Sequence, residues 1–344
     1  MSGGSRITRL QALVGVAAVA AVIVAAAAAT RHRRTTRGSM SPPVASPNEL
    51  LRTPSLQPDV TEILTDDGAA LCVRAYGPVD GEPIVLSHGW ACSSEYWYPQ
   101  VNALAGKYRV ITYDQRGHGR STVGSLAFGP DVLADDLSAV LKATVHEHNK
   151  AVIVGHSMGG MSIMAWADRH PDQVNKYASA VLLASTACDR LVADTNVIPL
   201  PNGFPRVPVQ VGRAVMSTPV PLVPSPAMTR AIQYTAMSPN ATRAEVQFCE
   251  NIVRDCDPRI RGGWGEALSG LDIHGALENL DVPTTVLVGS ADRLTPPVHS
   301  HRLACMLNGA GNLERLVVLP GVGHMSSVEN IEEFNKEIVR LRNL

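Results

Sequence analysis

The chain has 344 residues, with 30 Lys and Arg against 31 Asp and Glu, and a formal net charge of -1. This length suits one large α/β domain or two ordinary domains. The charges are interleaved without a basic stripe or tail, which excludes the footprint of a nucleic-acid-binding protein and favours a small molecule or lipid over a polyanion. The six cysteines form neither a C-x-x-C pair nor a zinc-like spacing, so we expect mostly buried thiols.

An uncharged run of mostly Ala and Val, residues 12–29, is flanked by arginines on both sides. Its length is at the lower edge of a membrane-spanning helix and exceeds the usual core of a signal peptide. Residues 1–30 are therefore predicted to be a membrane anchor, or a signal removed on export, because A-x-A cleavage sites lie near Ala27 and Ala29. The positive-inside rule would place the basic side after the run in the cytoplasm, whereas export would place it outside, so the side stays open.

Residues 31–59 are rich in Arg, Ser, Thr and Pro and predict a tether, because they hold too little apolar surface to fold. One folded domain is expected over residues 60–344, beginning with a hairpin at Asp66-Asp67-Gly68. Short Val, Ile and Leu runs then alternate with helical patterns, which predicts a mostly parallel sheet with helices on both faces. The strands are expected at 61–64, 71–76, 84–86, 110–113, 151–154, 180–184, 285–288 and 316–319, and the clearest helices at 132–146, 160–170 and 328–341.

The stretch 188–282 separates two neighbouring strands and is too long for a simple crossover. Its first part is dense in proline, and its second part has helical patterns. We predict an inserted cap over the carboxyl ends of the strands, where ligands of such folds bind. A floppy insertion unrelated to catalysis is the alternative.

The segment Gly155–Gly159, GHSMG, lies directly between an apolar run and a helical pattern. A serine hydroxyl must be presented sterically bare and beside a base to act as a nucleophile. A strand that turns abruptly into a helix does this, and glycines are needed because the turn leaves no room for β-carbons. The G-x-S-x-G pattern in this context predicts Ser157 as a nucleophile, with an incidental serine as the alternative.

A nucleophilic serine needs a base and an acid that orients the base. Asp292 and His324 each follow a predicted strand by a few positions, in the chain order Ser157, Asp292, His324. Asp189 is an alternative acid, and Asp292 could instead cap the helix after Thr295. A solvent-exposed turn histidine is the alternative for His324.

The loop after the strand 84–86 reads SHGW, and its glycine lets the backbone approach a substrate closely. We therefore expect the backbone N–H groups of Trp90 and Met158 to form an oxyanion hole. The Trp90 side chain could line the substrate pocket or simply pack in the core.

Together these segments resemble an α/β-hydrolase-fold serine hydrolase, within the group of esterases, lipases and cofactor-free haloperoxidases. The resemblance covers roughly residues 60–344 and implies an eight-stranded, mostly parallel sheet with an inserted cap. It also implies Ser157 as nucleophile, His324 as base and Asp292 as its orienter, and it makes Asp114–Gly119 a structural turn. The motifs that carry the resemblance are SHGW (87–90), DQRGHG (114–119), GHSMGG (155–160), GSAD (289–292) and GH (323–324).

The predicted activity is hydrolysis of an apolar or lipid-like carboxylic ester, without a cofactor or metal. Acyl transfer or perhydrolysis with the same residues is the near alternative. A carbon–carbon bond hydrolase is less favoured, because such enzymes often have Asn where this chain has His156. A non-catalytic binding protein of the same fold is the alternative outside enzymes. His299 and His301 lack further metal ligands, and Asp135-Asp136 is expected to be a solvated helix face or a cap partner.

Overall fold

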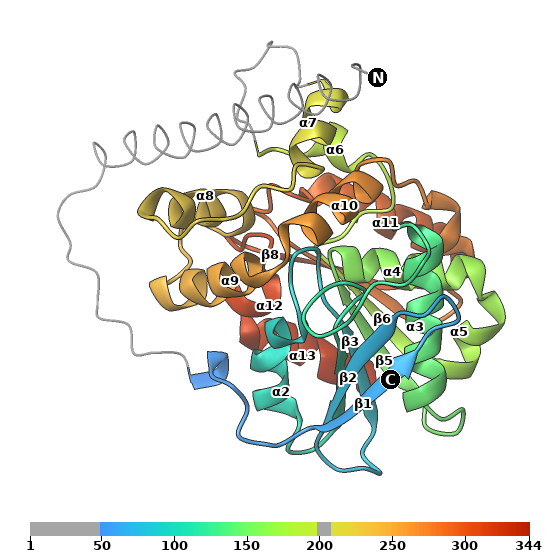
Figure 1. The fold of residues 1–344 in the computed structure, drawn as a ribbon. Helices are drawn as coiled ribbons and strands as arrows, with labels where there is room; N and C mark the ends of the chain where they lie inside the picture. Colours follow the sequence, from blue (N-terminus) through green and yellow to red (C-terminus); the bar gives the residue numbers. More distant parts are fainter. Residues whose placement is uncertain (1–48, 198–207) are drawn as a thin grey trace.

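The computed structural model describes residues 49–197 and 208–344 and shows one sheet between layers of helices (Figure 1). The eight strands are ordered β1-β2-β4-β3-β5-β6-β7-β8; β2 runs antiparallel to β1 and β4, and the other neighbouring pairs are parallel. The predicted fold class and the hairpin are therefore confirmed. The strands are β1 (Asp59–Leu64), β2 (Ala70–Tyr76), β3 (Pro83–Ser87), β4 (Arg109–Tyr113), β5 (Ala151–His156), β6 (Ala178–Ala184), β7 (Thr284–Gly289) and β8 (Leu313–Leu319).

The central strands are apolar throughout because both faces of the sheet are covered. On β5, Ala151 and Ile153 belong to one hydrophobic core and Val152 and Val154 to the other, as the alternation of side chains along a strand requires. Helices α3 (Pro130–Thr144), α4 (Met158–Arg169), α5 (Pro171–Tyr177) and α11 (Pro297–Ala310) cover the first face. The second face is covered by α2 (Tyr98–Leu104), α12 (Ser326–Glu329) and α13 (Ile331–Arg342), together with the short 3-10 helix η2 (Ser94–Trp97).

The last helical stretch differs from the single helix expected over 328–341. It consists of α12 and α13, which are separated at Asn330. Asn330 has a φ of -144° and a ψ of 67°, and its side chain accepts the backbone N–H of Glu333 at 3.3 Å. An asparagine that caps a new helix in this way ends the previous one. α12 begins at Ser326, only two residues after His324.

In the part of the inserted stretch that the structure describes, five helices lie at the edge where the parallel strands end (Figure 1). Two contacts fix this position: the Trp90 indole N–H, after β3, donates to the Arg261 carbonyl at 2.9 Å, and the His324 N–H, after β8, donates to the Ala236 carbonyl at 3.1 Å. The helices are α6 (Leu191–Asp194), α7 (Val209–Met216), α8 (Pro226–Ala236), α9 (Arg243–Asp255) and α10 (Pro258–Ser269).

The end of that stretch, residues 271–282, belongs to the body and not to the cap. The segment contains the 3-10 helix η3 (His274–Asn279), which packs directly against α4 and α11, and Leu277 and Leu280 are buried there. The structural cap is therefore shorter than the predicted range 188–282. Its boundary could not be read from the sequence because a short apolar helix has the same pattern in a cap and in a core.

The predicted anchor or signal, residues 1–30, lies outside the described residues, as does most of the predicted tether. Across 49–197 and 208–344, no helix combines the length and apolar character that crossing a bilayer requires. Residues 49–51 form the 3-10 helix η1, and the Asn102 side chain donates to the carbonyls of Leu50 and Arg52 at 2.9 and 2.8 Å. The folded part thus includes residues that the sequence assigned to the tether.

Candidate active site

Ser157 lies at the turn from β5 to α4 and is the N-cap residue of that helix. Its φ of 53° and ψ of -118° are rarely adopted by residues with a β-carbon, so the turn stores strain. Its backbone N–H donates to the carbonyl of Ala184 at 3.0 Å, and its carbonyl accepts the Thr186 hydroxyl at 2.7 Å. These bonds hold the turn, and Ser157 is half-buried where the strand before it is fully buried. The predicted strand–turn–helix is confirmed.

Two glycines make this turn sterically possible. A Cβ on Gly155 would lie 2.5 Å from the carbonyl oxygen of Gly159. A Cβ on Gly159 would overlap the carbonyl oxygen of Ser87 in the neighbouring strand. Both obstacles are backbone atoms, which cannot rotate away, so both positions require glycine.

His324 and Asp292 are brought together by the loops after β8 and β7. His324 Nδ1 donates to Asp292 Oδ2 at 2.9 Å, and the two residues are 4% and 3% exposed. The other carboxylate oxygen accepts the backbone N–H groups of Leu294 and Thr295, each at 2.9 Å, and the Thr295 hydroxyl donates to Oδ2 at 2.9 Å. The fixed carboxylate keeps the proton of the neutral imidazole on Nδ1, so Nε2 is free to accept a proton.

The alternative acid, Asp189, does not reach His324. Its carboxylate accepts Arg302 Nη1 at 2.6 Å and is engaged in that ion pair. The alternative reading of Asp292 as a helix cap also differs from the structure, because α11 starts at Pro297 and its N-cap is Pro296. Asp292 instead closes the turn before the helix and contacts His324 at the same time.

His156, the residue before Ser157, connects the two loops of the site. Its Nε2 donates to the backbone carbonyl of His324 at 2.9 Å, and the two imidazole centroids are 4.8 Å apart. Burial holds the pKa of His156 well below its usual value, so the ring stays neutral. The sequence reasoning assigned no such contact to His156, and its only signal was its place next to Ser157.

The loop after β3 and the start of α4 each present a backbone N–H. Among the described residues, the N–H groups of Trp90 and Met158 donate to no other group. For Met158 this follows from its place in the first turn of a helix. The loop of Trp90 is held by His88, whose Nδ1 donates to the Gly89 carbonyl at 2.8 Å and whose Nε2 accepts the Gln115 N–H at 2.9 Å.

The end of α8 in the cap holds both the loop of His324 and the loop of Asp292. The Ala236 carbonyl accepts the N–H of His324 at 3.1 Å. Arg293, next to Asp292, donates from Nη1 to the Tyr234 carbonyl at 2.7 Å and lies 4.5 Å above the Tyr234 ring. The cap is therefore anchored on the same loops that position these two side chains.

Glu329 forms a further link between the cap and the loop that carries His324. Its Oε2 accepts the N–H of Ser238, just after α8, at 2.7 Å and the N–H of Gly323 at 3.1 Å. Burial raises the pKa of the Glu329 carboxyl. No pattern in the sequence indicated this role for Glu329, because a glutamate at a helix end is usually solvated.

The turn Asp114–Gly119 has the structural role that the resemblance implied. Asp114 is fully buried, accepts the N–H and the hydroxyl of Ser94, each at 2.7 Å, and forms an ion pair with Arg74 at 3.2 Å. A Cβ on Gly119, which has a φ of 52°, would overlap the Asp114 carboxylate. The turn thus wraps tightly around a buried charge.

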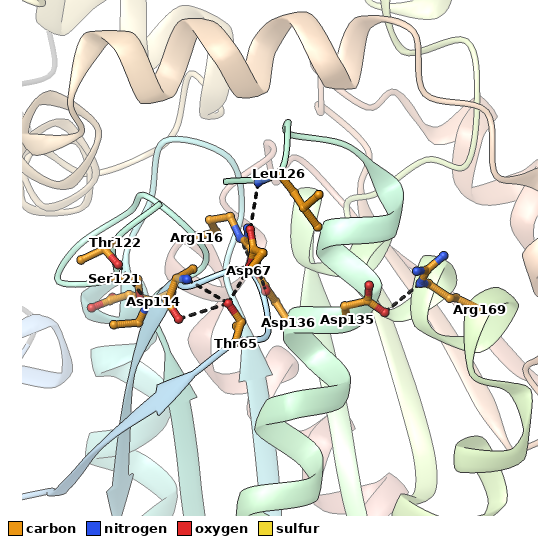
Figure 2. Close-up of polar contacts among 12 residues, drawn as sticks. Thr65, Asp67, Asp114, Arg116, Ser121, Thr122, Leu126, Asp135, Asp136 and Arg169 are labelled. Atoms are coloured by element: carbon orange, nitrogen blue, oxygen red, sulfur yellow. Dashed lines mark hydrogen bonds and ion pairs between the residues drawn. The ribbon is translucent and has the colours of Figure 1, made fainter. Parts of the chain in front are cut away.

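Arg116, in the same turn, pairs with the half-buried carboxylate of Asp67 and the buried carboxylate of Asp136 (Figure 2). Its Nη2 donates to Asp67 at 2.9 Å and to Asp136 at 2.7 Å. The expectation of a solvated helix face holds for Asp135, whose side chain is 40% exposed and pairs with Arg169 at 2.7 Å. It is wrong for Asp136, which is 3% exposed because its side chain points from α3 into the interior and pairs there with Arg116.

The two candidate metal ligands do not form a site. His299 is buried and His301 is exposed, so they point to different surroundings. The described ranges contain no group of three or more His, Cys, Asp or Glu that could hold a metal ion. All six cysteines lie in those ranges and are free, and all but Cys305 are buried, as expected.

The model of the alpha/beta hydrolase fold family matches residues 82–331. This chain belongs to that family. The matched residues include the whole of the site described above, from the loop of Trp90 to His324. The resemblance stated from the motifs is therefore confirmed.

Relatives within the family have hydrolase and haloperoxidase names. The chain is 29% identical over 284 residues to a non-heme chloroperoxidase from Burkholderia pyrrocinia, with 80% of this chain and 97% of the relative covered. It is 27% identical over 299 residues to a bifunctional esterase/perhydrolase from Acinetobacter calcoaceticus, with the same coverage of 80% and 97%. An esterase from Exiguobacterium antarcticum has the same fold, with a TM-score of 0.65 at 21% identity over 83% of this chain and 99% of that one. Family and relatives together support a hydrolase.

Proposed function

We propose that this protein is a serine hydrolase that cleaves a carboxylic ester through an acyl-enzyme on Ser157. The observation that carries the proposal is the hydrogen bond of 2.9 Å from His324 Nδ1 to the buried carboxylate of Asp292. It leaves His324 Nε2 to take the proton of the Ser157 hydroxyl. The strained turn and the bridge from His156 to the His324 carbonyl support the same roles, because they bring the serine and the histidine loop together.

In the proposed reaction, Ser157 Oγ attacks the ester carbonyl carbon while its proton moves to His324 Nε2. The carbonyl electron pair moves to oxygen, and the Trp90 and Met158 N–H groups stabilise the resulting oxyanion. When the intermediate collapses, the alcohol leaves with the proton from His324. Water then attacks the acyl-enzyme by the same steps and releases the carboxylic acid. Asp292 stays ionised throughout and stabilises the imidazolium.

A second candidate is perhydrolysis, in which hydrogen peroxide takes the place of water in the second step and yields a peracid. The names of the two curated relatives favour this candidate, since one is a chloroperoxidase and the other an esterase/perhydrolase. The acyl-enzyme is common to both reactions. The ratio of peracid to acid formed from one ester in the presence of peroxide would separate them.

Labelling with a fluorophosphonate probe tests the nucleophile directly. Wild-type protein should be labelled, and Ser157→Ala should not be labelled while its thermal unfolding stays within a few degrees of wild type. Ser162→Ala is the matched control, because Ser162 lies one turn further along α4 and donates to Gln115 Oε1 at 2.9 Å. It should keep the label. A folded wild-type protein that stays unlabelled would point to the non-catalytic binding protein instead.

We propose that the apolar run at 12–29 attaches the enzyme to a membrane or directs its export, on the strength of its length and flanking arginines. Fractionation of cells that express the full chain, followed by carbonate extraction and protease treatment, would test attachment and side. Release of a shortened protein into the medium would show cleavage.

A further inference from the structure

Arg261, in α10 of the cap, is a buried cation without an acidic partner. The residue is only 9% exposed. Its Nη2 donates to the Val220 carbonyl, while its buried Nη1 has no hydrogen-bond partner. No carboxylate in 49–197 or 208–344 lies within ion-pair distance of this guanidinium. Asp257, the acid nearest along α10, caps the helix by accepting the Arg259 N–H at 2.7 Å.

The rest of the chain cannot supply the missing carboxylate. Residues 1–48 and 198–207 contain no Asp or Glu. Burial lowers the pKa of Arg261, but a guanidinium starts from so high a value that it keeps its proton near neutral pH. The positive charge is therefore permanent and buried, and the exposed Asp257 acts on it only from beyond ion-pair distance, which is a costly arrangement without a ligand.

Arg261 lies on the face of α10 that contacts the oxyanion loop. Its carbonyl accepts the Trp90 indole N–H at 2.9 Å, and a Cβ on Gly265, one turn later on the same face, would lie 3.0 Å from the Trp90 ring. Trp90 is half-buried, and its backbone N–H is one of the two proposed oxyanion donors. The Arg261 side chain therefore leaves α10 on the helix face that contacts Trp90, the residue proposed to provide an oxyanion donor.

We propose that Arg261 binds a free carboxylate of the substrate, so that this enzyme prefers esters that carry a second, ionised acid group. A guanidinium offers a planar fork of N–H donors that matches a carboxylate. This inference rests on the proposed ester hydrolysis and narrows its substrate class. It departs from the uncharged, lipid-like ester that the sequence favoured, because a buried unpaired cation is a poor neighbour for a purely apolar substrate.

The test compares each acidic ester with its own neutral counterpart. The p-nitrophenyl half esters of adipic, pimelic and suberic acid would be assayed beside the same compounds with the free acid methylated. Wild type should have at least a tenfold higher kcat/KM for one of the acids than for its methyl ester. Arg261→Met should lose most of that preference and keep its activity on the methyl esters within about threefold. Arg261→Lys should be intermediate, because lysine keeps the charge without the fork.

Arg259→Met is the matched control, since Arg259 is an exposed arginine on the same helix, and it should keep the preference. Wild type that cleaves the methyl esters at least as well as the acids would overturn the proposal and leave ester hydrolysis intact. An Arg261→Lys variant with a preference as large as wild type would show that a positive charge is sufficient. That result would overturn the proposed pairing of the planar guanidinium with both oxygens of the substrate carboxylate. Failure of every ester together with absence of fluorophosphonate labelling would instead overturn the proposed hydrolysis itself.

Discussion

His156 donates a hydrogen bond of 2.9 Å from Nε2 to the backbone carbonyl of His324. The residue next to the proposed nucleophile therefore holds the loop of the proposed base. His156 is 1% exposed, and burial keeps its ring neutral. The hydrogen bond therefore does not depend on pH over the range in which His324 would accept the serine proton. The separation between Ser157 and His324 is set in part by a side chain that takes no proton itself.

This contact predicts a positioning role for His156 that can be separated from plain stability. His156→Leu should lower kcat about tenfold with KM within twofold, because one hydrogen bond of about 1 kcal/mol no longer holds the histidine loop. His156→Gln can place an amide N–H near the position of Nε2 and should recover most of kcat. A Leu variant that changes KM alone, or a Gln variant no better than Leu, would contradict the positioning role.

The identity of the acid can be tested with two matched substitutions. Asp292→Asn should lower kcat by about 10⁴-fold, because an amide can hold the imidazole in the wrong tautomer. Asp189→Asn should stay within about threefold of wild type, since Asp189 pairs with Arg302 and does not contact His324. Steady-state kinetics of both variants on one p-nitrophenyl ester would decide. Comparable losses in the two variants would speak against Asp292 as the orienting acid.

The Arg116 cluster predicts a large stability effect away from the site (Figure 2). Asp67→Asn should lower the free energy of unfolding by about 2 kcal/mol, because it removes one partner of the buried Arg116 from a pair that is itself only half-buried. Asp135→Asn, which breaks only the exposed pair with Arg169, should cost about 0.5 kcal/mol. Urea unfolding at pH 7 would measure both.

The pair of Arg116 and Asp67 also predicts that acid lowers the free energy of unfolding. The Arg116 guanidinium holds the pKa of Asp67 well below its usual value, so the stabilisation is complete above the unfolded pKa of about 4 and is lost as pH falls below it. The cost of Asp67→Asn should therefore shrink between pH 5 and pH 3. A cost that does not change over that interval would show that Asp67 stabilises the fold by packing and not by charge.

A buried histidine predicts a second pH effect, at higher pH. Burial lowers the pKa of His118 to about 3, while its Nε2 accepts the Ala91 N–H at 3.2 Å. Between about pH 6.5 and pH 3 the unfolded chain binds a proton at this side chain that the folded chain does not, so acid lowers stability. His118→Gln should make the fall in unfolding free energy shallower by about 1.4 kcal/mol per pH unit between pH 6 and pH 4. An unchanged slope would mean that His118 is protonated in the folded protein.

Motifs and hydrophobic periodicity were sufficient to predict the strands, the turn at Ser157 and the loops that carry Asp292 and His324. They depend on local rules: buried parallel strands are continuously apolar, and the turn at Ser157 needs glycine at fixed offsets. The exact extent of the cap was not predictable, because the segment 271–282 has a helical pattern in either location. Asp136 was misjudged for a related reason, since its buried partner Arg116 is 20 residues away in the chain.

The sequence by itself determined the α/β sheet, its family and the order of the three candidate residues, because each of these is encoded within a few neighbouring positions. Only the tertiary structure decided that Asp292 and not Asp189 contacts His324, that His156 and Glu329 hold the histidine loop, and that Arg261 has no acidic partner. Each of these is a pairing between residues on different loops and helices. Such a pairing depends on how the loops and the cap pack together, and no local pattern in the chain records it.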